Sequence, residues 1–166
     1  MNPFFVLKFV MGAILLILFE ACFSQPLSIG NLPSSSCQEE NYSVLRRGKN
    51  SLRPMCVMKI LKPYNVKTDK TVALVSLNGK ITKILLKKHS VKTGRLSKSQ
   101  PTLGMREMYL FYSKANNTSV LLDAQVTKSS CCTDTENCCG DDFKGTLTIR
   151  KDGSQMVIPV SYYLGG

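Results

Sequence analysis

The sequence contains no tryptophan and only one histidine, His89. These shortages argue against several classes of fold and of catalytic site. An immunoglobulin-like domain normally packs a tryptophan against two core cysteines, so that superfamily is not indicated. Any histidine-dependent catalytic group would need His89, which lies among lysines in KKHS with no carboxylate nearby in the sequence. Glycine-rich phosphate loops and GxSxG elbows are also missing. We predict a non-enzymatic protein without a cofactor, and a hydrolase that uses paired carboxylates is the enzymatic alternative.

Long hydrophobic runs are missing too, except for FVMGAILLILF at residues 9–19. This run follows Lys8, is closed by Glu20 and is shorter than the roughly 20 residues that a spanning helix needs. Cys22 and Ser24 then supply the small residues that precede a signal-peptidase cut. We predict a signal peptide over residues 1–24, a secreted extracellular protein and no transmembrane segment after cleavage. An uncleaved signal anchor is the alternative.

Cysteine use agrees with secretion, because removing Cys22 leaves an even number of cysteines. We predict that all of them form disulfides: Cys37, Cys56, Cys131, Cys132, Cys138 and Cys139. Neighbours such as Cys131 and Cys132 are not expected to pair, since adjacent Cα atoms are about 3.8 Å apart and bridges need roughly 4.4 Å or more. Long loops gain most from a disulfide, so we expect Cys37 or Cys56 to be joined to the 131–139 cluster. A Cys37–Cys56 bridge with a separate knot in the cluster is the competing arrangement.

Acidic residues are scarce outside the loop that we expect at residues 131–142. Its acids are Asp134, Glu136, Asp141 and Asp142, and their spacing does not match an EF-hand. A solvated acidic turn is the interpretation we adopt, with a calcium-binding loop as the alternative and no metal site predicted.

Strand signals fill the rest of the chain, and no helical stripe of useful length is present. YSVLRR at residues 42–47 and MCVMKIL at residues 55–61 are strand candidates. Arg46-Arg47, a dibasic pair that a convertase could cut, lies inside the first of them, which favours a structural role. Residues 25–40 are rich in proline and serine and predict an extended arm before a single β domain at residues 41–166.

The strongest local signal is TVALVSLNGKITKILL at residues 71–86, where Asn78-Gly79 separates two β-branched runs. Asn-Gly favours a type I′ turn, which would place Ser76 opposite Ile81. Further hairpins are predicted around residues 113–117 and 151–153, and residues 87–104 form a polar basic loop. Pro159 suggests that the last strand lies at an edge or carries a bulge. About eight strands result, which predicts an all-β antiparallel sandwich or small barrel stapled by disulfides.

Positive charge is concentrated in one part of the chain, with nine Lys or Arg and no acid from Lys70 to Arg106. Extracellular partners for such a surface are polyanions: sulfated glycans, acidic matrix proteins and anionic membranes. Nucleic acid is not expected, because this stretch has no Phe, Tyr or Trp that could stack on bases. The predicted polyanion-binding residues are Lys80, Lys83, Lys87, Lys88, Lys92, Arg95 and Lys98.

Glycosylation sequons begin at Asn41, Asn116 and Asn117, and the last two fall at a predicted hairpin tip. Together these features predict a secreted binding or matrix protein whose basic face docks on polyanions. A diffusible ligand or toxin that engages a receptor through its loops is the alternative.

Overall fold

The computed structural model describes residues 26–33, 43–47, 55–61, 70–94, 102–130 and 140–165 of the chain. The described residues are all-β. The strands are β1 (Ser43–Arg47), β2 (Met55–Leu61), β3 (Val72–Leu77), β4 (Lys80–Lys92), β5 (Arg106–Ser113), β6 (Thr118–Ser130), β7 (Gly140–Lys151) and β8 (Ser154–Gly165). Within these ranges no helix has the length and apolar character to cross a membrane.

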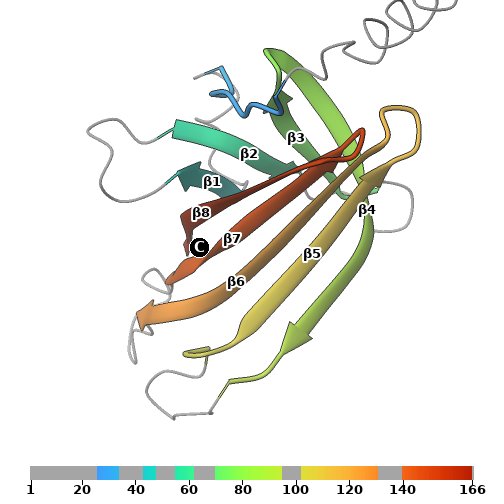
Figure 1. The fold of residues 1–166 in the computed structure, drawn as a ribbon. Coiled ribbons are helices and arrows are strands. Elements are labelled where there is room, and N and C mark those ends of the chain that lie inside the picture. The colour runs from blue at the N-terminus through green and yellow to red at the C-terminus, as the bar shows by residue number, and fades with distance from the viewer. Residues whose placement is uncertain are drawn as a thin grey trace, which may run out of the picture.

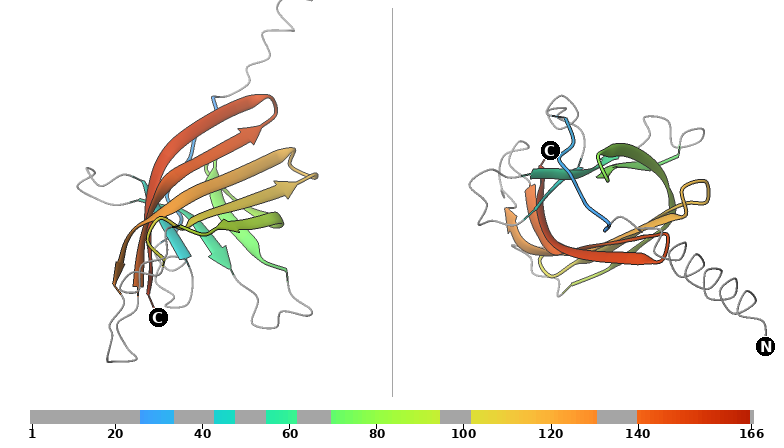
Figure 2. Two further views of the ribbon diagram at one scale, coloured as in Figure 1. Left: turned by 90° about the horizontal axis from the view of Figure 1, so that it is seen from below. Right: turned by 45° about the horizontal axis from the view of Figure 1, so that its top comes forward.

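The strands follow one another in chain order around one strongly curled antiparallel sheet (Figures 1 and 2). β1 pairs along β2 and meets β8 through Arg46 with Ser161 and Arg47 with Val160, which closes the sheet into a barrel. The predicted all-β antiparallel fold is confirmed, and the strands form a single curled sheet instead of a two-sheet sandwich. Arg46-Arg47 lies within β1, as the strand signal predicted.

The hairpin of β3 and β4 turns where the sequence predicted. Asn78 and Gly79 have φ angles of 48° and 75°, the left-handed values that a type I′ turn requires. Ser76 lies opposite Ile81, so the predicted register is confirmed. Asp152 and Gly153 turn β7 into β8 with φ angles of 48° and 80°.

Strand β4 is longer than predicted. Its pairing with β3 stops at Leu85, but its pairing with β5 continues to Lys92, with a bulge between Leu86 and Lys88. The prediction of a loop over residues 87–104 is therefore wrong for residues 87–92. Beyond Leu85, the edge of β4 that faced β3 has no paired β3 residue. Polar residues are then tolerated on both faces of β4, and the alternation of apolar and polar residues is lost.

Strand β7 also begins earlier than predicted. It starts at Gly140, and Asp141 and Asp142 pair with Ser129 and Lys128 of β6. These two acids therefore belong to a strand and not to the acidic loop. Asp134 and Glu136 lie outside the described residues.

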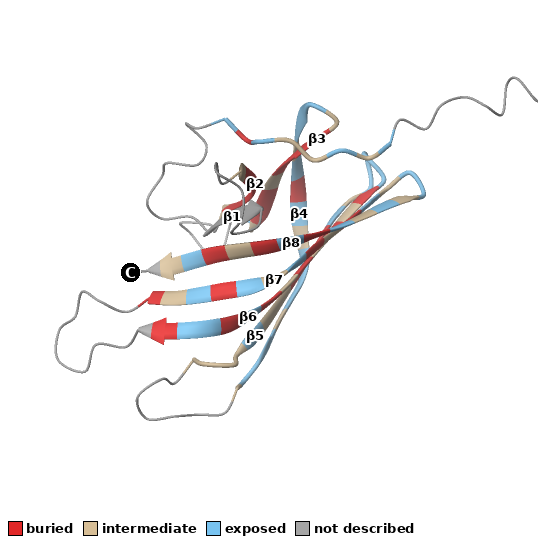
Figure 3. Cartoon of the chain, turned by 60° about the vertical axis from the view of Figure 1, so that its left-hand side comes forward, coloured by how far each residue is buried: buried red, intermediate tan, exposed pale blue. Residues whose placement is uncertain are grey.

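The core lies on the inner face of the barrel, as the alternation of buried and exposed positions along β6, β7 and β8 indicates (Figure 3). Val120, Leu147 and Ile149 have no exposed surface, whereas Val157 on the outer face is 53% exposed. Gly145 lies where β7 approaches β6 so closely that a Cβ atom would overlap the backbone oxygen of Asp123. A glycine here allows the sheet to bend.

Pro159 of β8 pairs with Thr146 of β7 on one side. On the other side of β8, the described part of β1 pairs with Val160 and Ser161. β8 therefore has a neighbour on both sides and pairs with β7 without a bulge, so the prediction of an edge or bulged last strand is wrong for the strand as a whole. Among the described residues, Pro159 has a ladder partner on the β7 side alone, which suits a residue with no N–H to donate.

The N-terminal arm belongs to the core. The described part, residues 26–33, bonds to β3 through the Ile29–Leu77 bridge and to β2 through a 2.7 Å hydrogen bond from the Leu32 amide to the Cys56 carbonyl. Leu32 is only 4% exposed, and Leu27 and Ile29 pack against the core. The arm crosses the barrel beside the β3–β4 turn (Figure 2). We call this end, with the turns at 78–79, 114–117 and 152–153, the turn end, and the opposite end, where β4, β6 and β8 finish, the loop end.

Candidate functional site

The basic strip consists of the five lysines of β4 that the sequence singled out, and all five are exposed: Lys80, Lys83, Lys87, Lys88 and Lys92. Lys83, Lys88 and Lys92 point to the outer face, since their cross-strand partners Leu74, Leu110 and Arg106 are outward-facing positions. At about 3.3 Å per residue, Lys83 and Lys92 are roughly 30 Å apart along the strand. The result is a row of exposed cations along one strand, with a bulge within it between Leu86 and Lys88. Arg95 and Lys98 lie outside the described residues.

One acid interrupts this side of the barrel. Arg106, opposite Lys92, makes a two-pronged salt bridge with Asp123 of β6. The hydrogen bond from Arg106 holds the pKa of Asp123 below its ordinary value, and the charge of Lys92 adds to the effect. The strip lysines make no ion pair with any other described residue. Sequence reasoning did not find Asp123, because it is brought beside β4 only by the pairing of β5 with β6.

Exposed apolar side chains accompany the lysines on the outer face. Ile81, Leu85 and Tyr112 are 53%, 46% and 43% exposed, and Leu85 pairs with Tyr112 across β4 and β5. The paired Leu85 and Tyr112 therefore form a small exposed apolar group beside the lysines.

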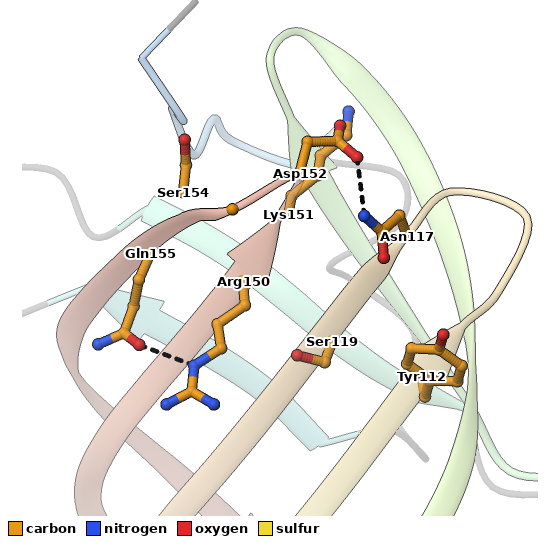
Figure 4. A pocket seen from close by; sticks show the side chains of 9 residues that line it. Tyr112, Asn117, Ser119, Arg150, Lys151, Asp152, Ser154 and Gln155 are labelled. Atoms are coloured by element: carbon orange, nitrogen blue, oxygen red, sulfur yellow. Dashed lines mark hydrogen bonds between the residues drawn. The ribbon is translucent and has the colours of Figure 1, made fainter. Parts of the chain in front are cut away.

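A shallow groove of about 290 Å³ lies beside this face at the turn end (Figure 4). Its lining residues are Tyr112, Asn117, Ser119, Arg150, Lys151, Asp152, Gly153, Ser154 and Gln155. Within it the Arg150 Nε donates to Gln155 Oε1 at 2.7 Å, and the Asn117 amide donates to Asp152 Oδ1 at 3.2 Å. Tyr112 and Arg150 extend the site beyond the residues that the sequence predicted.

The predicted glycosylation residues Asn116 and Asn117 are exposed in the β5–β6 turn, at the tip where they were expected. Asn117 also lines the groove, so a glycan there would lie at its rim. Asn41 lies outside the described residues, and glycosylation itself remains a prediction.

Cys56 is the one predicted disulfide residue that the structure describes. It is buried in β2 and disulfide-bonded. Cys37, Cys131, Cys132, Cys138 and Cys139 lie outside the described residues, so the connectivity remains a prediction. Over the described ranges no cluster of three or more histidines, cysteines or acids could hold a metal ion.

A second polar group lies inside the barrel near the loop end. The Tyr109 hydroxyl donates to Glu107 Oε2 at 2.8 Å, and the His89 ring stacks on Tyr109 with centroids 4.2 Å apart. Tyr162 of β8 stacks on Phe143 at 4.6 Å. Burial, followed by the hydrogen bond to Glu107, raises the pKa of Tyr109, and burial followed by the charge of Glu107 raises that of Tyr162.

Sequence reasoning did not identify this interior group, because its members lie on β4, β5, β7 and β8 and only the pairing of the whole sheet brings them onto one inner face. It sets His89 beside a tyrosine that binds a carboxylate, although no carboxylate adjoins His89 in the sequence. Comparison with known proteins finds no matching family model, no matching curated protein and no matching solved structure.

Proposed function

We propose that the protein is a secreted, non-enzymatic binding protein whose basic strip docks on extracellular polyanions. The observation that supports this best is the linear row of exposed lysines on β4, none of which is ion-paired with another described residue. A row that extends about 30 Å along one strand suits an extended polyanion, such as a sulfated glycan, better than a compact anion.

The first test is heparin-column retention of two matched triple variants. Lys83→Gln, Lys88→Gln and Lys92→Gln remove three charges from the strip, whereas Lys114→Gln, Lys128→Gln and Lys144→Gln remove three exposed charges elsewhere. Because both variants lose the same net charge, only a local site separates them. We expect the strip variant to elute at clearly lower salt than the control variant. If the strip variant and the control variant elute at the same salt concentration, retention depends on net charge alone, and the proposal is overturned.

Asp123→Asn provides a test with the opposite sign. The change removes the acid that binds Arg106 and leaves that guanidinium free beside Lys92. We expect a modest increase in the salt needed for elution, since one more cation becomes available to the polyanion. A decrease would indicate that the Arg106–Asp123 pair shapes the strip instead of masking it.

An anionic membrane surface is a second candidate partner, favoured by the exposed Ile81, Leu85 and Tyr112. Apolar side chains beside lysines are typical of proteins that lie on anionic lipid. Sedimentation with vesicles of phosphatidylcholine, with and without phosphatidylserine, tests it. The variant Ile81→Ser with Leu85→Ser should lose vesicle binding and keep heparin retention if membranes are the partner; unchanged vesicle binding would count against this candidate.

A further inference from the structure

We propose that the inside of the barrel at the loop end is a binding site for a small protonated amine with an aromatic body, with Glu107 as its counter-charge. This site is separate from the basic strip, which lies on the outer face, and the inference does not depend on polyanion binding. Glu107, Tyr109, Tyr162 and His89 are the residues that carry it.

Glu107 supplies an acceptor with unused capacity. It faces inward, between Val91 of β4 and Ala124 of β6 in the cross-strand pairing, and it is half-buried. Its hydrogen-bond partner in the described part of the chain is the Tyr109 hydroxyl, and it makes no ion pair there. A carboxylate can accept about four hydrogen bonds, so most of its capacity remains for a ligand. A protonated amine satisfies both this capacity and the charge.

Tyr162 supplies the second, independent observation. Its side chain is 6% exposed, and its hydroxyl has no hydrogen-bond partner among the described residues. Roughly nine in ten buried polar groups have a partner, so an unpaired phenol inside a barrel needs an explanation. On the inner face, the cross-strand row from Glu107 runs through Ala124 and Gly145 to Val160 of β8, and Tyr162 is the next inward-facing residue of β8. After burial, the charge of Glu107 also contributes to the raised pKa of Tyr162. A ligand held by Glu107 therefore lies on the same inner face as the Tyr162 hydroxyl and can pair with it.

Aromatic rings provide walls for the body of the ligand. His89 with Tyr109 and Phe143 with Tyr162 form two stacked pairs, with interplanar angles of 15° and 6°. Ring faces attract cations and pack against apolar groups. In the row that contains Glu107, the next positions on β6 and β7 are Ala124 and Gly145, where the two strands lie against each other and no side chain larger than a methyl group projects inward.

Among the described residues, the arm and β3 leave the loop end uncovered. β3 has no partner on β4 beyond Leu85, and Val91, although it faces inward, is 47% exposed. The arm that covers the barrel lies at the other end, beside Asn78. A small molecule therefore reaches Glu107 from the loop end without displacing the described arm.

The net charge of +11 opposes the approach of a cation. This repulsion acts at long range, and at physiological ionic strength it is screened over about 8 Å. The amine and the carboxylate of Glu107 would be in contact at about 3 Å, a distance shorter than this screening length. Their attraction therefore outweighs the screened repulsion from the rest of the protein.

The experiment measures the affinity of the full mature chain for tyramine and for its uncharged counterpart 4-ethylphenol by isothermal titration calorimetry. His89, the single histidine of the chain, gives a second readout, because its imidazole proton resonances should shift when a ligand stacks near Tyr109. We expect tyramine to bind at least about tenfold more tightly than 4-ethylphenol. Equal affinities, or no binding of tyramine up to about 5 mM, where even a millimolar site would be mostly filled, would overturn the proposal.

Two variants locate the site. Glu107→Gln should weaken tyramine at least about tenfold and leave 4-ethylphenol unchanged, because it removes the charge and little volume. Tyr162→Phe should weaken tyramine about threefold or more while the unfolding temperature stays equal or rises, since it removes an unpaired buried hydroxyl. If Glu107→Gln does not fold, Tyr162→Phe decides alone. Tyramine affinity unchanged in Tyr162→Phe, or a loss of affinity that follows a loss of fold, would assign Tyr162 a structural role and reject the site. The strip variant with Lys83, Lys88 and Lys92 replaced should bind tyramine like the wild type.

Discussion

The two ends of the barrel are built from the same strands but carry different chemistry. At the turn end the arm adds Leu27, Ile29 and Leu32 to an aliphatic interior, and tight turns join the strands. At the loop end the inward-facing residues include Glu107 and Tyr162, and one wall stops early because β3 is short. Sealing one end with apolar side chains supplies stability that allows polar groups to remain inside the other. The residues that stabilise the fold thus lie at the turn end, and the polar interior residues lie at the loop end. Four predictions test this division.

The largest expected loss of stability comes from the sealed part of the core. Phe111 has no exposed surface, so Phe111→Ala should cost about 3–5 kcal/mol of unfolding free energy. Val91 also faces inward but is 47% exposed, and Val91→Ala should cost less than about 0.5 kcal/mol. Urea denaturation of both variants measures the difference. Similar losses at the two positions would contradict the division between the ends.

The arm should matter next. Leu32 is 4% exposed, and Leu32→Ala should cost about 2–3 kcal/mol and make the arm more sensitive to limited proteolysis. Pro33, its exposed neighbour, provides the control, and Pro33→Ala should change little. A Leu32→Ala protein with wild-type stability would show that the arm rests on the barrel without sealing it.

A smaller loss is expected at the β3–β4 turn. A Cβ atom on Gly79 would meet nothing within 4 Å, so the cost of Gly79→Val is conformational and arises from its φ of 75°. A left-handed backbone costs an L-residue about 1–2 kcal/mol, and a β-branched one the most. Thermal unfolding tests this, with Lys80→Val as the control in ordinary strand backbone. Equal melting of Gly79→Val and wild type would mean that the turn relaxes to another geometry.

The smallest effect, nil at neutral pH, concerns the loop end. The pKa values of Tyr109 and Tyr162 are raised, chiefly by burial, whereas an unfolded tyrosine titrates near 10. Their neutral forms therefore contribute stability that is fully present below about pH 10 and is lost as the pH rises above it. The double variant Tyr109→Phe, Tyr162→Phe should lose less stability than wild type between neutral and strongly alkaline pH. Tyr163→Phe, at an exposed site, should behave like wild type, and identical alkaline profiles for all three proteins would refute this account.

Local features of the sequence predicted the parts of the fold that depend on neighbouring residues. The Asn78-Gly79 turn fixes the register of β3 against β4 because the turn and the β-branched runs lie within one stretch of chain. The extension of β4 to Lys92 could not be seen in the same way, since residues 87–92 are polar apart from Val91 and are mostly exposed, so they show no apolar alternation. The arm was predicted only to be extended. Its packing against the core could not be predicted, because the few apolar residues that make these contacts show no helical or strand periodicity in the sequence.

The candidate sites divide along the same line. The basic strip was visible because its lysines are close in sequence, although they lie on a strand and not on the predicted loop. Asp123 and the interior group of Glu107, Tyr109 and Tyr162 depend on which strands become neighbours. That information is carried by the pairing of the whole barrel, which no single stretch of chain specifies.

The seam between β1 and β8 has a consequence for how the barrel assembles. Each other pair of adjacent strands is consecutive in the chain, so those pairs can zip together one after another over short stretches. β1 and β8 are the exception, because Arg46 must find Ser161 from far along the chain. Closing this seam carries the largest loop-closure entropy of any strand pair in the barrel, so we expect it to form last.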